Sequence, residues 1–274
     1  MTNLLLIIIA LLLTGATPVI AQSDTKEQLV IPLTEPNKPG SLDLGLINGF
    51  IHVVGYSGKD VVIDAASNPR ASTRNEERNN TSGMRRIPTG NGLDISAEEK
   101  NNRVRVNANS HQKPVNLTIK VPQRFSLKLS TVNNGDITVE NVNGELEINN
   151  VNGAIELTNI SGSAVANTIN GDLKATFKDV SANAPMAFST LNGRIDVTLP
   201  ASAKANMKLK SDRGDIFSDF DIDVDKSQPK STRSAQSGMY KVSVDDWVYG
   251  KINKGGPEFM MKSMQGSIYI RKAK

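Results

Sequence analysis

The chain has 274 residues, with 32 Lys and Arg against 28 Asp and Glu, a formal net charge of +4 and no cysteine. It therefore forms no disulfide and no thiolate metal site, and its basic and acidic residues are mixed along the sequence, so the small positive charge does not indicate a nucleic-acid partner. Aromatic residues are scarce, whereas Asn, Ser, Thr and Gly are common, which favours short strands with polar turns over a helical bundle.

The N-terminus has the layout of a secretory signal peptide. An apolar run covers Leu4–Leu13, and Val19 and Ala21 fit a cleavage site before Gln22. An uncleaved membrane anchor is the alternative, but the run is shorter than the roughly 20 apolar residues that span a bilayer. Residues 1–21 are therefore predicted to be a signal peptide. The mature chain is expected in the periplasm, on the outer cell surface or secreted, with no integral membrane span.

The first third of the mature chain alternates between strand signals and irregular stretches. An extended leader is predicted for residues 22–40, which are polar and contain three prolines. Alternating apolar and polar residues predict strands at 42–44, 48–53, 61–63, 93–95, 104–106 and 117–121. Residues 68–91 are rich in arginine and have little to bury, so they are predicted to form a flexible, solvated insertion.

A short unit built around glycine recurs from residue 135 onward. In Asn152-Gly153-Ala154-Ile155, for example, the glycine is followed two residues later by an apolar side chain. The first five of these glycines are nine residues apart. The repeat glycines are Gly135, Gly144, Gly153, Gly162, Gly171, Gly193, Gly214 and Gly266. Self-similarity at a fixed period predicts a repeat architecture.

Frames of 18 to 22 residues superimpose the apolar side chains of residues 121–217 in two pairs per frame. The first pairs are Leu127 and Leu129, Leu146 and Ile148, Ala164 and Ala166, Met186 and Phe188, and Met207 and Leu209. The second pairs are Ile137 and Val139, Ile155 and Leu157, Leu173 and Ala175, Ile195 and Val197, and finally Ile216 alone. Both sets are predicted to face inward.

The nine-residue spacing is odd, whereas side chains alternate along a strand with period two. One residue must therefore leave the pleat in each repeat, and the odd steps Val139–Val142, Ile148–Val151 and Leu157–Ile160 indicate where. The repeat glycines are expected either to adopt a positive φ or to lie where the coil leaves no room for a side chain.

Two all-β folds fit this pattern. In a single-stranded β-solenoid each frame is one coil that stacks on the next at about 4.8 Å. In an antiparallel β-meander or sandwich each Asn-Gly is a hairpin turn. The frame lengthens from 18 to 22 residues while the motif stays in phase, so we expect the solenoid, as one repeat domain over residues 41–274.

The pattern loosens after residue 217. Residues 218–225 alternate strictly and predict a strand that places four aspartates, Asp219, Asp221, Asp223 and Asp225, on one face. A polar loop is expected at 226–237 and strands at 240–244 and 247–249. The apolar pair followed by glycine returns in 259–270, which is predicted to be the last coil or a capping strand pair.

The sequence gives no catalytic set and no cofactor site. His52 and His111 are the only histidines and lie far apart, so neither a zinc site nor a nucleophile–base pair is predicted. The repeats supply too few acidic ligands for calcium-binding nonapeptides. Asp219, Asp221 and Asp223 are the one metal candidate, although an ordinary exposed strand face is the favoured interpretation.

Two further side-chain groups are singled out by their spacing. Trp247 and Tyr249 share a strand face and are a candidate platform for stacking a sugar ring, the alternative being that they close the end of the core. Asn134, Asn152, Asn170 and Asn192 recur at one corner, where they are expected to stack and hydrogen-bond along a solenoid axis rather than bind a ligand.

The ordered set of motifs resembles bacterial adhesins of the DUF4097 type, which are related to auto-transporter adhesin head domains. The matching segments, spread over residues 41–272, are the Asn-Gly-x-Ile repeats, residues 49–56, 218–221, 253–257 and 266–271. The resemblance implies an exported β-solenoid of the bacterial envelope with no catalytic residues to transfer. The Arg-rich stretch 68–91 and Lys254 depart from the family pattern.

The function expected from these features is that of a non-enzymatic surface adhesin or envelope scaffold, whose partner is an envelope protein or a glycan. A carbohydrate-binding module is the first alternative. A polysaccharide-cleaving β-helix enzyme is the second, and it would need carboxylates that converge on one groove.

Overall fold

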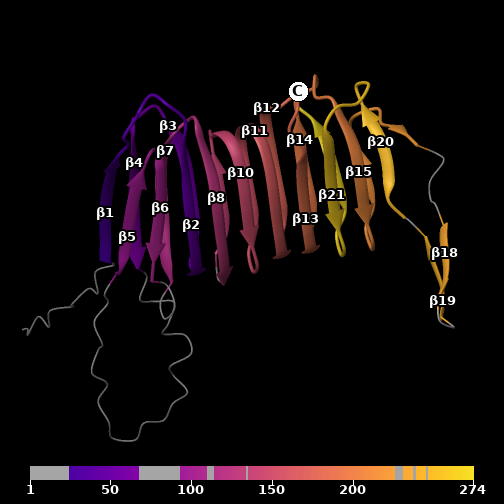
Figure 1. Cartoon of the computed structure of the whole chain (residues 1–274), viewed down its shortest axis with the longest axis horizontal. Helices are drawn as coiled ribbons and strands as arrows, with labels where there is room; N and C mark the ends of the chain where they lie inside the picture. Colours follow the sequence, from indigo (N-terminus) through magenta and orange to yellow (C-terminus); the bar gives the residue numbers. More distant parts are fainter. Residues whose placement is uncertain are drawn as a thin grey trace, which may run out of the picture.

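The computed structural model describes residues 25–67, 93–109, 114–133, 135–225, 231–236, 239–244 and 246–274. These residues form one elongated β-solenoid with two sheet faces, together with a small separate hairpin (Figure 1). The described residues contain no helix that could cross a bilayer. The signal peptide predicted for 1–21 and the insertion predicted for 68–91 lie outside the described residues.

Face A of the solenoid is the sheet formed by the first strand of each coil. In spatial order its strands are β5 (Ile95–Lys100), β6 (Arg103–Ala108), β2 (Gly40–Asn48), β8 (Phe125–Asn133), β10 (Asn143–Asn150), the second half of β11 (Ile155–Asn170), β13 (Met186–Asn192), β21 (Glu258–Ser263), β15 (Ala205–Ser211), β20 (Val248–Ile252) and β17 (Asp223–Val224).

Face B is the sheet formed by the return strands. In spatial order its strands are β1 (Thr25–Pro32), β4 (Asp60–Ser67), β7 (Val115–Pro122), β3 (Ile51–Tyr56), β9 (Ile137–Glu140), the first part of β11, β12 (Leu173–Val180), β14 (Ile195–Leu199), β22 (Ile268–Lys272) and β16 (Ile216–Ser218). The hairpin of β18 (Ser231–Gln236) and β19 (Met239–Val244) forms its own two-stranded sheet.

Parallel pairing between equivalent strands identifies the fold as a solenoid. Gly144 pairs with Gly162, and Ile155 lies between Ile137 and Leu173, each shifted by 18 residues and running in the same direction. A meander would pair successive strands antiparallel, so that alternative is wrong for the coils. The predicted apolar pairs all face the interior and are buried, except Ile216, which is half-buried.

The order of the coils in space differs from their order in the sequence. The pair β21–β22 lies between the coils β13–β14 and β15–β16 instead of forming the last coil. The pair β2–β3 is likewise inserted between β6–β7 and β8–β9. Figure 1 shows both insertions, with β2 between β6 and β8 and β21 between β13 and β15. Each coil offers the same parallel edges, so apolar spacing alone does not fix which neighbour it joins.

The odd nine-residue spacing requires a residue to leave the pleat, and this residue is an asparagine at a corner of the coil. Asn141 and Asn159 have φ of 58° and 56°, and the pairing register shifts between Leu157 and Ile160, as the spacing predicts. The step predicted at Ile148–Val151 is wrong, because Asn150 is the buried residue there and Val151 is only half-buried.

Glycine is required along one corner by close approach of neighbouring coils. A Cβ on Gly153 would lie 2.1 Å from the carbonyl oxygen of Gly135, and a Cβ on Gly171 would lie 2.1 Å from that of Gly153. Neither residue has a positive φ. The lack of room, rather than the left-handed conformation, therefore accounts for these repeat glycines.

The ends of the solenoid hold several departures from prediction. Within the predicted leader, Thr25–Pro32 is an edge strand paired antiparallel with β4. The predicted strand 218–225 is broken into β16 and β17, with a bend at Asp219 and Phe220. Part of the predicted polar loop forms β18. The break lets Phe220 turn into the core, where it is 6% exposed.

Candidate binding face

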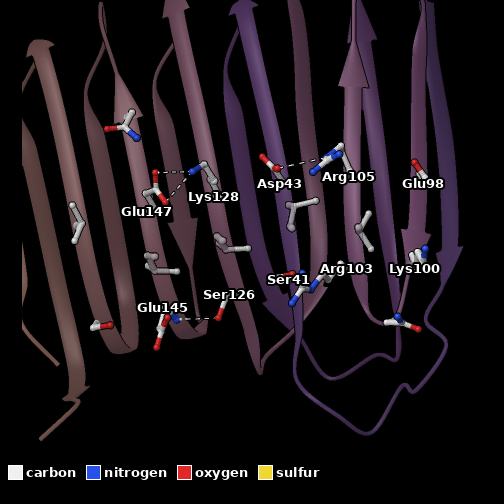
Figure 2. Close-up of a pocket in the computed structure, with 18 of the residues that line it drawn as sticks. Ser41, Asp43, Glu98, Lys100, Arg103, Arg105, Ser126, Lys128, Glu145 and Glu147 are labelled. Atoms are coloured by element: carbon white, nitrogen blue, oxygen red, sulfur yellow. Dashed lines mark hydrogen bonds and ion pairs between the residues drawn. The ribbon is translucent and has the colours of Figure 1, made fainter. Parts of the chain in front are cut away.

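A long groove crosses the outward side of face A at its N-terminal end. Its cavity volume is about 1110 Å³, and it is lined by outward side chains of β5, β6, β2, β8, β10 and β11. Figure 2 shows these side chains pointing into the same space from neighbouring strands. The groove exists because β2 is inserted between β6 and β8, so segments distant in sequence supply its walls.

One row of outward positions in the groove alternates in charge from strand to strand. We call it the charge row, and it consists of Glu98, Arg105, Asp43, Lys128 and Glu147 in register. Arg105 lies 3.6 Å from Asp43, and Lys128 lies 2.9 Å from Glu147. The hydrogen bond that Lys128 donates to the Glu147 carboxylate, together with the attraction of that negative charge, raises the pKa of Lys128 above its usual value. Each of these pairs is exposed and adds little to stability.

A second row in the groove leaves cations without counterions. Lys100 and Arg103 face each other across the β5–β6 pair, and among the described residues neither has an ion-pair partner within 4.0 Å. Ser41 and Ser126 continue this row toward Glu145, whose backbone N–H donates to the Ser126 hydroxyl at 3.3 Å. The groove is thus basic at the β5–β6 end and acidic at the β10 end.

A third row on face A is apolar although it is exposed. We call it the apolar stripe, and it consists of Ile47, Val132, Val151, Ile169, Leu191 and Met264, one from each of six neighbouring coils. Val151 is half-buried and the other five are 37–43% exposed. This row was not predicted from the sequence.

Hydrogen-bonded amide ladders lie on both sides of the stripe. On the corner side, Asn192 donates to Asn170, Asn170 to Asn152 and Asn152 to Asn133, at 2.6, 2.8 and 3.3 Å. This confirms the predicted stack of Asn152, Asn170 and Asn192, whereas Asn134 lies outside the described residues. On the other side, Asn167 donates to Asn149 at 3.1 Å and accepts from Ser189 at 2.6 Å.

A ladder of inward polar side chains, which hydrogen-bond to glycine carbonyls, was also not predicted from the sequence. One inward side chain per coil donates to a glycine carbonyl in a neighbouring coil. The acceptor is a repeat glycine for Asn150, Thr168, Thr190, Ser263 and Ser211, and it is Gly49 for Thr131. All six donors are buried except Ser211, which is half-buried. The signal in the sequence is a Thr, Ser or Asn three residues before the repeat glycine, or four residues before it at Thr131. Among the described residues, no hydrogen-bond donor reaches the buried carbonyl oxygen of the Asn150 side chain.

The structure does not bring together Asp219, Asp221 and Asp223, the aspartates of the candidate metal site. Asp219 follows β16 and Asp223 begins β17, so the aspartates share no single strand face. The Asp219 carboxylate accepts the backbone N–H of Lys272 at 3.3 Å. Across the described residues, no group of three or more His, Cys, Asp or Glu could hold a metal ion.

Trp247 and Tyr249 lie on the outward side of face A at its C-terminal end. Both are half-buried, and the Lys208 ammonium lies 4.9 Å from the centre of the Trp247 ring. A different aromatic pair has one ring that is more exposed. Phe217 and Tyr269 stack on the outward side of face B with ring centres 5.1 Å apart, and Phe217 is 49% exposed.

The comparisons with known proteins agree with the repeat-based resemblance. Residues 126–247 match the family described as Toastrack DUF4097. A putative cell adhesion protein from Clostridium sporogenes is 12% identical with a TM-score of 0.42, covering 92% of this chain and 100% of its own. A putative adhesin from Bacteroides fragilis is 14% identical with a TM-score of 0.35, covering 92% of this chain and 98% of its own. No curated protein matches. The family match confirms the resemblance to the DUF4097 family that the repeats predict, over residues 126–247.

Proposed function

We propose that the chain is an exported, non-enzymatic adhesin or envelope scaffold that binds a macromolecular partner along the groove of face A. The observation that supports this most is the charge row, in which five charges of alternating sign stand about 4.8 Å apart on paired strands. A rigid backbone holds these charges before the partner arrives. Pre-organised electrostatic complementarity of this kind favours specificity and fast association.

The unpaired cations indicate what the groove would bind at its β5–β6 end. Lys100 and Arg103 lie directly opposite each other, and like charges in that position are unfavourable. An anionic group between them would relieve the repulsion and accept hydrogen bonds from both side chains. We therefore propose a partner, either an envelope protein or a glycan, that presents an anionic group there.

The carboxylates in the groove favour binding over catalysis. Glu145 and Glu147 share one face of β10, about 7 Å apart, a spacing that glycoside hydrolases also use. Such enzymes keep one acid protonated in an apolar environment. Here both side chains are exposed, and Glu147 is paired with the Lys128 ammonium.

A carbohydrate-binding role is the second candidate, and the Phe217–Tyr269 pair favours it. The two near-parallel rings are offset at the C-terminal edge of face B, and no further strand covers Phe217 among the described residues. An exposed aromatic face is able to stack on the apolar face of a sugar ring. A cation lies over one ring of each pair, Lys208 at Trp247 and Arg271 at Tyr269. The Trp247–Tyr249 platform is less favoured because both of its rings are half-buried, whereas Phe217 is exposed.

Binding of the purified exported chain to isolated cell envelopes tests the proposal. The double variant Lys100→Gln with Arg103→Gln is expected to weaken binding at least about fivefold, the equivalent of about 1 kcal/mol for exposed charge contacts. A matched control, Lys120→Gln with Lys174→Gln, removes the same charge from face B and is expected to leave binding unchanged. Equal loss in both variants, or no binding by the unaltered chain, would contradict the groove assignment. Loss with Phe217→Ala alone would favour the carbohydrate candidate.

A further inference from the structure

The apolar stripe is not part of the groove and needs its own explanation. Among the described residues, ten large hydrophobic side chains are exposed, and five of them lie on this single row. Isolated exposed apolar residues are ordinary, but a contiguous exposed row is typical of an interaction site. The sixth member, Val151, fills the middle of the row and makes it continuous.

The surroundings of the stripe favour a protein partner over a membrane. From β2 to β13 the adjacent row is Gly45, Ser130, Asn149, Asn167 and Ser189, and the corner row is Asn48, Asn133, Asn152, Asn170 and Asn192. None of these residues is charged, and Lys262, which continues the adjacent row beside Met264, is a single cation at one end. Surfaces that lie on membranes instead place several Lys and Arg along their apolar side chains. Many of the amides already hydrogen-bond along the axis, so covering them costs little.

The spacing of the stripe restricts the kind of partner further. Its side chains repeat at the strand separation of about 4.8 Å, so six of them span about 24 Å in a straight line. One face of a helix repeats at about 5.4 Å and one face of an extended strand at about 6.7 Å. Over six coils, neither of these repeats stays aligned with the side chains of the stripe. A second stack of parallel coils has the same strand separation and stays aligned over the whole length. This chain itself carries an apolar row with that spacing.

We propose that the apolar stripe binds the same stripe of a second copy of this chain. Contact between two stripes places no charged row against another, so the net charge of +4 on each copy acts only from a distance and is largely screened. Paired copies would also present two grooves side by side, which raises avidity for a repetitive partner. The self-association itself does not depend on the function proposed for the groove.

The size of the stripe predicts a weak, reversible dimer. It is comparable to the largest apolar patches of monomeric proteins, about 300–600 Å², and falls below the roughly 800 Å² per partner of a stable complex. A dissociation constant on the order of 10–100 μM is therefore expected.

Sedimentation velocity of the exported chain from about 1 to about 200 μM, a range that brackets this constant, tests the proposal. Ile169→Lys places a charge in the middle of the stripe and is expected to raise the dissociation constant at least tenfold. The control Val165→Lys changes a residue of the same strand with matched exposure, 40% against 43%, outside the stripe. It is expected to dimerise like the unaltered chain, and both variants should keep its melting temperature.

Three results would overturn the proposal. The first is an unaltered chain that remains monomeric throughout the range. The second is a dimer that Ile169→Lys leaves intact, and the third is equal weakening by Ile169→Lys and Val165→Lys.

Discussion

Adding a single methyl group at Gly171 tests why glycine recurs along the solenoid. The new Cβ would lie 2.1 Å from the carbonyl oxygen and 2.5 Å from the carbonyl carbon of Gly153, far inside van der Waals contact. Because these atoms belong to the backbone, no side-chain rotation relieves the clash. Gly171→Ala must therefore push two neighbouring coils apart by about 1 Å, an overpacking effect.

The loss in free energy of unfolding caused by Gly171→Ala follows from the hydrogen bonds between coils at this corner. The Gly171 N–H donates to Asn192 at 3.0 Å, the Gly153 N–H donates to Asn170 at 3.0 Å, and the Thr190 hydroxyl donates to the Gly171 carbonyl at 3.0 Å. Losing two or three of them at about 1 kcal/mol each predicts a destabilisation of about 2–3 kcal/mol. For a domain of this size that corresponds to a melting temperature lower by about 5–10 °C.

Thermal melting followed by far-ultraviolet circular dichroism measures the effect. The control is Gly45→Ala, whose Cβ would have only the Ser130 hydroxyl oxygen, at 3.1 Å, as a close neighbour. That side chain is free to rotate, so we expect a change within about 1 °C, the small effect typical of a surface substitution. Two results would refute close approach of the coils as the reason for the repeat glycines. One is a Gly171→Ala chain with the melting temperature of the unaltered protein, and the other is a Gly45→Ala chain that is equally destabilised.

Three further changes have definite expected outcomes. Ile155→Asp puts a carboxylate at a fully buried position and should cost several kcal/mol and unfold the repeats; an unchanged melting curve would exclude the inward register. Asn150→Thr removes a buried oxygen that has no hydrogen-bond partner in the described part of the chain and keeps the side-chain donor found in the coils on either side, so the free energy of unfolding in denaturant should rise by about 1 kcal/mol. The backbone N–H groups of Thr34 and Asn102 lower the pKa of Glu99 below 4.5, so its contribution is present above that pH and is lost as the pH falls further. At neutral pH the unaltered chain should have a higher melting temperature than Glu99→Gln, and this difference should shrink below pH 4.5. A difference that does not change with pH would contradict the role given to Glu99.

The inward register of the coils could be predicted from the sequence. Pairs such as Ile155 and Leu157 recur at a fixed offset, and burial of an apolar pair depends mainly on that local alternation. The asparagine corner at Asn141 and Asn159 was equally accessible, because an odd repeat must break the pleat once. The prediction failed at Val151, where a hydrogen-bonding Asn150 replaces an apolar residue on the inward side.

The groove could not be predicted, because it depends on which coils are neighbours. Asp43 meets Arg105 and Lys128 only because β2 is inserted between β6 and β8. Every coil offers parallel edges of the same kind, so the spacing of apolar residues along the chain carries no information about this order. The break after Ser218 was hidden for a different reason: burial of Phe220 outweighs a strictly alternating pattern.

The groove and charge row of face A depend on this spatial order of strands. Engineered cysteine pairs test the order directly, because the chain has no cysteine of its own. Adjacent parallel strands bring Cα atoms within about 5 Å of each other, and a disulfide does not form beyond about 7 Å. With β2 inserted, oxidation should link Asp43→Cys to Arg105→Cys and, in a second variant, Asp43→Cys to Lys128→Cys. The pair Arg105→Cys and Lys128→Cys, two strand separations apart, should remain reduced. A disulfide in that last pair, with none between positions 43 and 128, would show that the coils stack in sequence order and that the charge row does not exist.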